Sequence, residues 1–143
     1  MIELVPLRAE QARRIAGGDL VGVEHAAGWP HDDTVDGLSL VESGARAWLV
    51  VLDGVVIGDC GTTGPRGPVV EIGFGLAAEC RGRGYGTEVV RLLVASLQDD
   101  PIVSSVVAHT LPENTASRRV LEKAGFAFDG EHDGLARYVC HVV

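Results

Sequence analysis

The sequence lacks the features that mark membrane, secreted and metal-binding proteins. Within its 143 residues no apolar run approaches the roughly 20 residues of a membrane-spanning helix. The first residues show no basic segment followed by an apolar core, so we expect no secretion signal. The three cysteines, Cys60, Cys80 and Cys140, are too widely spaced for a metal site or a disulfide framework. We therefore expect a cytoplasmic protein without a metal and without a membrane partner.

Positive charge is also scarce. The chain holds 12 lysines and arginines against 20 aspartates and glutamates, a formal net charge of −8. This balance disfavours nucleic acid as a partner, because a phosphate backbone needs a basic surface. It suits a cationic substrate such as an amine, although negative charge also serves solubility alone.

What is present fits one domain over residues 1–143. Hydrophobic residues make up 46% of the chain, enough for a substantial core. Alternation, helical spacing and turn residues predict strands at 2–7, 47–52, 55–62, 69–76, 102–110, 127–132 and 135–142. Helices are expected at 8–16, 84–98 and 112–124, with weaker helical segments at 19–25 and 33–43. This order predicts an α/β fold, a mixed sheet with helices on both faces.

A glycine-rich loop joins the strand at 69–76 to the helix that follows it. Gly82, Gly84 and Gly86 can adopt positive φ and turn their backbone N–H groups outward, and the helix adds the positive end of its dipole. These features predict an anion site suited to a pyrophosphate. Because Thr87 and Glu88 follow Gly86, and no glycine register fits a dinucleotide fingerprint, the loop argues against a nucleotide-binding protein.

Two segments in the right order resemble the GCN5-related N-acetyltransferases. The family's acyl-CoA loop, Arg/Gln-x-x-Gly-x-Gly/Ala, is matched by RGRGYG at 81–86, and a second family segment by NTASRRVLEKAGF at 114–126. The likeness is strongest to the subgroup that acetylates ribosomal-protein N-termini, with its small-molecule relatives. It implies a mostly antiparallel sheet whose two central strands splay apart, and often a homodimer.

The resemblance also implies an activity. It is acetyl-CoA-dependent transfer of an acetyl group to a protein N-terminus or a small amine, by direct attack in a ternary complex. A non-catalytic module that binds acyl-CoA for regulation is the alternative.

The resemblance assigns residues to acetyl-CoA. The backbone of Phe74, Gly75 and Leu76 is expected to bind pantetheine. The side chains of Asn114 and Ser117 are expected near the cofactor, although Asn114 also suits a helix N-cap and Ser117 a packing position. The pyrophosphate set is expected to be Arg81, Gly82, Arg83, Gly84, Tyr85, Gly86 and Thr87, where Arg83 could equally be a solvent-facing charge.

The general base and general acid of this reaction are less evident from the sequence. Candidates for the base that takes a proton from the amine are Glu71, which shares a strand face with Gly75, and His109, because histidine as a residue type suits a base at neutral pH. Several family members protonate the thiolate with a tyrosine where this chain has Leu121. Ser117 or water could replace it, or the thiolate could leave unaided, since a thiol pKa of about 8.5 makes it a tolerable leaving group.

An aromatic and acidic cluster precedes the segment at 33–43. Trp29, His31 and Asp32 are candidates to line the acceptor mouth, where an acidic group and an aromatic face would attract an ammonium ion. His31 and Asp32 are further candidates for the base. The alternative is a surface turn that buries one tryptophan.

Overall fold

The structure is a computed structural model, and it describes residues 1–31, 34, 38, 41 and 44–142. Among these residues the helices with defined bounds are α1 (Ala9–Ala16), the short 3₁₀ helix η2 (Ala78–Cys80), α3 (Tyr85–Gln98) and α4 (Thr115–Lys123). Its strands are β1 (Ile2–Pro6), β2 (Ala47–Leu52), β3 (Val55–Thr62), β4 (Val69–Leu76), β5 (Ser105–Thr110), β6 (Ala127–His132) and β7 (Leu135–His141).

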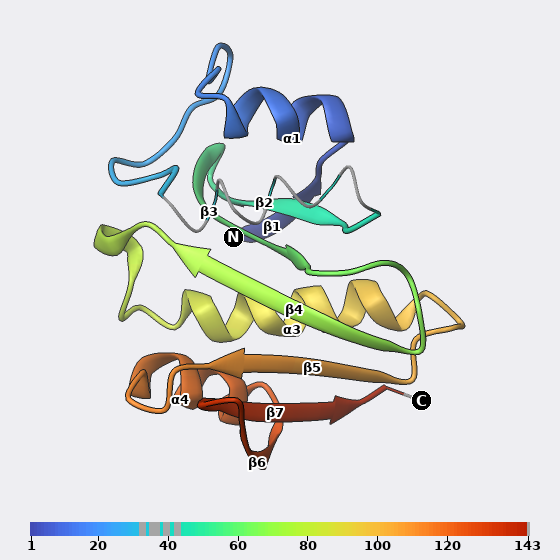
Figure 1. Cartoon of the computed structure of the whole chain (residues 1–143). Coiled ribbons are helices and arrows are strands. Elements are labelled where there is room, and N and C mark those ends of the chain that lie inside the picture. Colours follow the sequence, from blue (N-terminus) through green and yellow to red (C-terminus); the bar gives the residue numbers. More distant parts are fainter. Residues whose placement is uncertain (32–33, 35–37, 39–40, 42–43, 143) are drawn as a thin grey trace.

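The strands form one sheet in the order β1-β2-β3-β4-β5-β7-β6 (Figure 1). Every neighbouring pair is antiparallel except β4 and β5, which run parallel. Tight Asp-Gly turns join β2 to β3 and β6 to β7. Asp53 and Asp133 have φ of 51° and 53°, the left-handed backbone that such two-residue hairpins require. The predicted mixed, mostly antiparallel sheet is confirmed.

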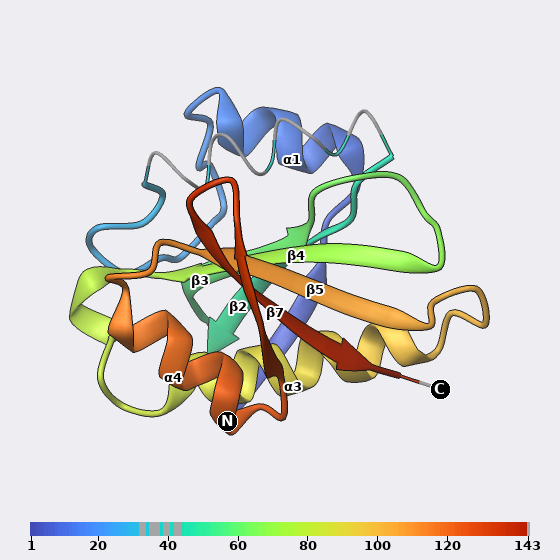
Figure 2. The same ribbon diagram turned by 60° about the horizontal axis from the view of Figure 1, so that its bottom comes forward.

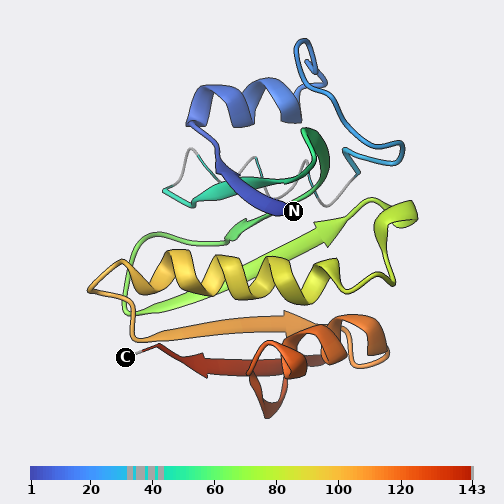
Figure 3. The ribbon, with the colours of Figure 1, turned by 180° about the vertical axis from the view of Figure 1, so that it is seen from behind.

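Helices cover both faces of the sheet, but unequally. Figure 2 shows α1 on one face and α3 and α4 on the other, and Figure 3 shows α3 and α4 in front of the strands. The α3 residues Val89, Val90, Leu93 and Leu97 pack with Val70, Ile72, Val106 and Ala108 in the main core. Ala12 and Ile15 of α1 pack with Leu49, Val51 and Val56 in a second core. Because α1 lies over β1–β3, no helix of the described residues covers the same face of β4, β5 and β7.

The first part of the chain differs from the sequence prediction. The weak helical segment expected at 19–25 is wrong: Asp19 Oδ1 accepts the Val21 backbone N–H at 3.2 Å, Gly22 has φ of 79°, and His25 forms a bridge with Val56. This side chain-to-backbone bond competes with a helical turn. The helical segment expected at 33–43 lies mostly outside the described residues. In the described part of the chain, every helix is too short or too polar to cross a membrane.

An ion-pair cluster fastens the far end of the sheet to α3. Asp100, just after α3, accepts two hydrogen bonds from Arg66, Nε to Oδ2 and Nη2 to Oδ1, each at 2.7 Å. Arg46 adds a weaker pair at 3.9 Å. The Asp100 carboxylate also accepts the Ile102 backbone N–H at 3.1 Å, and these contacts lower its pKa from 3.8 to about 2. The largest cause is the hydrogen bonding from Arg66.

This cluster predicts that the free energy of unfolding depends on pH in the acid range. A carboxylate whose pKa is lower when folded stabilises the fold above the unfolded pKa, and this stabilisation is lost as pH falls through the folded pKa. Asp100→Asn should therefore reduce the free energy of unfolding at pH 7, with the difference from wild type shrinking between pH 4 and 2. Urea unfolding across this range measures it, with Asp99→Asn as the neighbouring control. An unchanged difference at pH 2 would contradict the assignment.

Candidate active site

The glycine loop has the backbone geometry that the sequence predicted. It follows η2 and ends at α3, whose N-cap is Gly84. Gly82 and Gly84 have φ of 76° and 82°, and a Cβ at either would meet no atom within 4 Å. Glycine is thus required here by backbone conformation and not by crowding. The loop lies open at the N-terminus of a 14-residue helix whose first N–H groups lack intrahelical partners.

Two other members of the predicted pyrophosphate set have additional structural roles. A Cβ at Gly86 would lie 3.1 Å from Val120 Cγ2, so this glycine lets α3 and α4 approach closely. Arg81 Nε donates to the Leu76 carbonyl at 3.2 Å and so folds the loop back against the end of β4. Arg83 lies in the loop and is exposed. Tyr85 and Thr87 lie in the first turn of α3.

The two central strands separate beside this loop. β4 and β5 are paired only from Val69 with Ser105 to Ile72 with Ala108. Beyond Ile72, β4 keeps its pairing with β3 as far as Leu76, while β5 continues with β7 to Thr110. The edge of Gly73–Leu76 that faces β5 therefore has no strand partner. The predicted splay is confirmed, and it leaves the Phe74, Gly75 and Leu76 backbone, expected to bind pantetheine, without a strand partner on the β5 side. The Leu76 carbonyl is bonded by Arg81 instead.

Helix α4 borders the same end of β5. Asn114 is its N-cap, with Oδ1 accepting the Ser117 backbone N–H at 3.1 Å. Leu121 is buried (1% exposed) in the core, on the side of the helix away from solvent. Arg118 turns away from the loop: Nε donates to the Tyr138 hydroxyl and Nη1 to the Pro112 carbonyl, both at 2.9 Å. The bond to Tyr138 raises the Arg118 pKa, and the cation holds α4 against β7.

Glu71 and His109, proposed separately from the sequence, meet in the structure. His109 Nδ1 lies 3.4 Å from Glu71 Oε2, on the face of the sheet that α1 leaves uncovered. Their side chains are 22% and 45% exposed, so both remain reachable from solvent. A carboxylate beside Nδ1 favours a proton on that nitrogen, which leaves Nε2 of neutral His109 as a hydrogen-bond acceptor. The pair has the arrangement of a base and the group that orients it.

The segment before the 33–43 region forms a buried polar network. Trp29 is 2% exposed, and its Nε1 donates to Asp59 Oδ2 at 2.8 Å. Thr34, fully buried, donates through Oγ1 to the same oxygen at 2.6 Å. In this structure the indole is packed in the core, as in the tryptophan-burying turn considered above. Asp32 lies outside the described residues.

His31 is the member of this segment that reaches β4. A Cβ at Gly75 would lie 3.1 Å from both Cε1 and Nε2 of His31, so the imidazole occupies the space that a side chain at position 75 would need. Sequence reasoning missed the anchors of this arrangement, Asp59 and Thr34. A carboxylate at Asp59 inside an apolar strand was the one available signal, because such a charge is retained only with partners.

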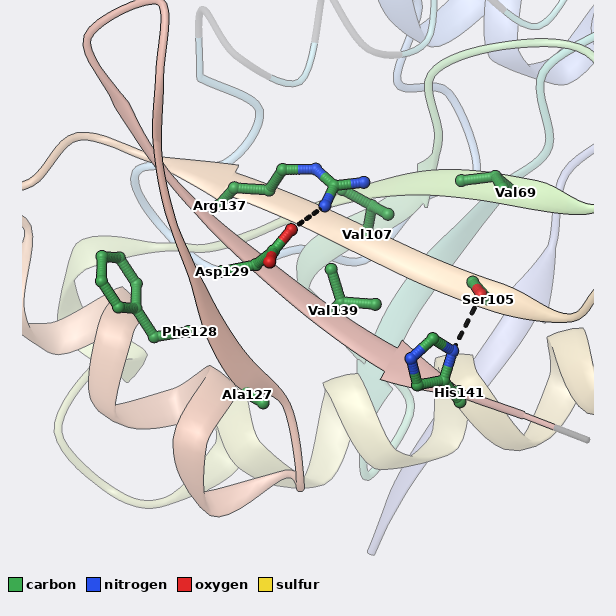
Figure 4. A pocket seen from close by; sticks show the side chains of 9 residues that line it. All are labelled: Val69, Ser105, Val107, Ala127, Phe128, Asp129, Arg137, Val139 and His141. Carbon is green, nitrogen blue, oxygen red and sulfur yellow. Dashed lines mark hydrogen bonds and ion pairs between the residues drawn. The ribbon is translucent and has the colours of Figure 1, made fainter.

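A hollow of about 380 Å³ opens on the uncovered face (Figure 4). The lining residues on β4, β5 and β7 alternate with the core positions of those strands, so their side chains point away from α3. Phe128 of β6 instead contacts the Tyr138 ring and lies under the Arg118 guanidinium. Arg137 is paired with Asp129, and Ser105 Oγ lies 3.1 Å from His141 Nδ1. The hollow is lined by Val69, Ser105, Val107, Ala127, Phe128, Asp129, Arg137, Val139 and His141. It adjoins the Glu71–His109 pair, since Val107 is the strand partner of Glu71 and Arg137 that of His109.

The described residues contain no group of three or more His, Cys, Asp or Glu side chains placed to hold a metal ion. The site consists of the open glycine loop, the splayed strands and the acid–histidine pair, and a comparison with known families agrees with it. Residues 2–127 match the acetyltransferase (GNAT) domain. The chain belongs to this family.

Curated relatives of this GNAT domain match over part of its length. A kanamycin resistance protein of Rhizobium radiobacter is 41% identical over 61 residues, which are 41% of this chain and 56% of that protein. An aminoglycoside N(6')-acetyltransferase type 1 of Klebsiella pneumoniae has the same identity over 61 residues, 30% of its length. The match thus spans about half or less of each curated relative.

Solved structures extend the likeness to the whole GNAT fold. The aminoglycoside acetyltransferase AAC(6')-Ib in complex with coenzyme A has a TM-score of 0.73 at 24% identity, covering 99% of this chain and 95% of that one. The ribosomal L7/L12 alpha-N-protein acetyltransferase RimL in complex with coenzyme A has a TM-score of 0.71 at 15% identity, covering 99% and 94%. The resemblance read from the sequence is confirmed, and a ribosomal-protein acetyltransferase is among the neighbours.

The contact of His31 with Gly75 gives a first prediction for this site. Gly75→Ala should lower the free energy of unfolding by about 1 kcal/mol, since the new methyl group forces a packed ring to move. Gly73→Ala is the matched control: it lies on the same face of β4, and its Cβ would meet nothing within 4 Å. Urea unfolding of both variants measures the difference. Equal stabilities would show that the His31 ring does not rest on Gly75.

Proposed function

We propose that this protein transfers an acetyl group from acetyl-CoA to a primary amine. The observation that carries the proposal is the end of β4–β5 pairing at Ile72, beside an open glycine loop and the Glu71–His109 pair. Relatives named as aminoglycoside acetyltransferases, and neighbours solved with coenzyme A, support it. The three cysteines are free, which suits a reducing cytoplasm as the compartment.

The residues fit acetyl-CoA in three places. Residues 81–87 would hold the pyrophosphate through backbone N–H groups and the α3 dipole, with Arg83 and the Thr87 hydroxyl as additional contacts. The free edge of Phe74, Gly75 and Leu76 would pair with pantetheine as a strand partner does. Asn114 and Ser117 would border the thiol end. Acetyl-CoA supplies the activated thioester, and the chain supplies its position.

The pair on the uncovered face would handle the proton. His109 Nε2 would accept the proton that the attacking amine loses, and Glu71 would hold the ring through Nδ1 and stabilise the imidazolium that forms. With Leu121 buried in place of a tyrosine, the thiolate would leave unaided or take a proton from water or Ser117. The reaction needs no covalent bond to the enzyme.

The hollow beside this pair is our proposed acceptor site. Its volume of about 380 Å³ falls within the range typical of small-molecule pockets. It offers the apolar Val107 and Val139 together with hydrogen-bonding groups. We therefore propose a small amine as the first acceptor class, supported by the names of the curated relatives, and a peptide N-terminus as the second.

Other partners follow from the charge and the fold. A net charge of −8 leads us to propose neither nucleic acid nor a membrane surface as a partner. A homodimer stays a prediction, which a measurement of the molecular mass in solution would test. The competing function, a non-catalytic acyl-CoA-binding module, predicts cofactor binding with no thiol release for any amine. Thiol release in the presence of acetyl-CoA and a panel of aminosugars, polyamines and short peptides separates the two.

The loop predicts a selective effect on binding. Gly84→Ala should weaken coenzyme A binding about tenfold or more, because alanine at φ of 82° strains the backbone that presents the N–H groups. Gly134→Ala is the control, since Gly134 has φ of 80° and equally open surroundings but lies in the β6–β7 turn. Calorimetric titration of coenzyme A into both variants measures the contrast. Equal affinities would contradict a cofactor role for the loop.

The acid–histidine pair predicts a graded loss of turnover. His109→Gln should lower kcat by about 10² or more while leaving coenzyme A affinity near wild type, because it removes only the proton acceptor. Glu71→Gln should lower kcat less, about tenfold, since it removes only the orienting charge. His132→Gln, on β6 outside the site, is the control. Full activity of His109→Gln would show that the base lies elsewhere.

A further inference from the structure

Hydrogen bonds of its segment hold His31 over β4. Its backbone N–H donates to Thr34 Oγ1 at 3.3 Å, and Thr34 Oγ1 in turn donates to Asp59 Oδ2. Trp29 donates to the same Asp59 oxygen, so both sides of the His31 segment are anchored to β3. The imidazole packs against Gly75, which defines its position along β4.

The hydrogen bonds define which nitrogen of His31 carries the proton. The Thr34 backbone N–H donates to His31 Nδ1 at 3.3 Å. Thr34 Oγ1 also lies 3.3 Å from this nitrogen, a contact whose direction depends on the tautomer. The position of an amide hydrogen is fixed by the backbone, so a second hydrogen on Nδ1 would collide with it. We assign the neutral ring with its proton on Nε2 from this contact. His31 Nε2 is therefore a donor, and in this form it has no lone pair with which to act as a base.

This donor has no hydrogen-bond partner in the part of the chain that the structure describes. Nε2 of His31 is closed off from solvent, and no described residue accepts a hydrogen bond from it. Buried polar groups in folded proteins are nearly always paired, because an unmet donor loses its hydration without compensation. A network that leaves one N–H group unpaired is the arrangement expected of a donor for a ligand. Because this nitrogen is closed to solvent, the ring or the residues that cover it must shift when the ligand binds.

The surroundings indicate which ligand atom. Glu71, Gly73 and Gly75 occupy successive outward positions of β4, about 7 Å apart. Gly73, in the middle, has open space where a side chain would be. The open position thus lies between the Glu71–His109 pair on one side and His31 on the other. It borders the free edge of β4 that we assign to pantetheine.

We propose that His31 donates its Nε2–H to the carbonyl oxygen of the acetyl thioester. This inference rests on the proposed function. As the amine nitrogen forms its bond to the carbonyl carbon, negative charge grows on that oxygen, and His31 stabilises it without giving up its proton. The C–S bond then breaks, the sulfur leaves with the electron pair, and the amine proton passes to His109. His31 is in this account a catalytic donor, and the small surface of Gly75 is what allows it to approach.

Histidine NMR of the full chain tests the assignment directly. In ¹⁵N-labelled protein, His31 should show the Nε2–H form without ligand. Acetyl-CoA should shift the Nε2–H resonance, whereas S-ethyl-CoA, which lacks the carbonyl, should leave it nearly unchanged. An Nδ1–H ring, or equal shifts with both compounds, would overturn the inference alone. Failure of acetyl-CoA to bind would overturn the proposed function as well.

Kinetics provide the second test. His31→Leu should lower kcat by about 10², the usual effect of losing one donor to a developing oxyanion, with coenzyme A affinity unchanged. His31→Gln keeps an N–H donor and should recover part of the loss. His132→Leu is the control. Unchanged kcat in His31→Leu, or no difference between the Leu and Gln variants, would overturn the role of the donor, and loss of coenzyme A affinity would indicate a structural role instead.

Discussion

The end of β4–β5 pairing at Ile72 is the constraint on which the rest of the site depends. Parallel strands are stable where both edges are paired, so a strand that leaves its neighbour needs support from elsewhere. Here β3 pairs β4 as far as Leu76, and β7 pairs β5 as far as Thr110. The two antiparallel neighbours let the central strands part without loss of the sheet. The free edge that results is the feature on which the proposed binding of pantetheine rests.

The glycines of β4 make this edge usable on the face that α1 leaves open. Glu71 supplies a charge, while Gly73 and Gly75 leave room where side chains would stand. The cost of glycine in a strand is conformational entropy and lost packing. β4 nevertheless has glycine at two successive positions on this face, and His31 from a distant segment packs over one of them, Gly75. The shape of this face thus depends on missing side chains as much as on present ones.

Local signals in the sequence predicted most of the sheet and the loop. Asp53-Gly54 and Asp133-Gly134 defined the hairpins, and the spacing of Val89, Val90 and Leu93 defined α3. The splay came from the family resemblance, since no local pattern ends the β4–β5 pairing. The meeting of Glu71 with His109, and of His31 with Gly75, depends on register between distant strands. The turn at 19–25 was missed because Asp19 prefers its own side chain-to-backbone bond over a helical turn.

The close contact between Gly86 and Val120 has a consequence for how this chain can evolve. One position lies in the loop end of α3 and the other in α4, and the space between them admits no further methyl group without movement. A larger residue at 86 would therefore force the Val120 side chain to shift, and a smaller residue at 120 would relieve that contact. Among homologues the two positions should co-vary in side-chain volume, so that part of the apparent loop signature records helix packing and not ligand chemistry.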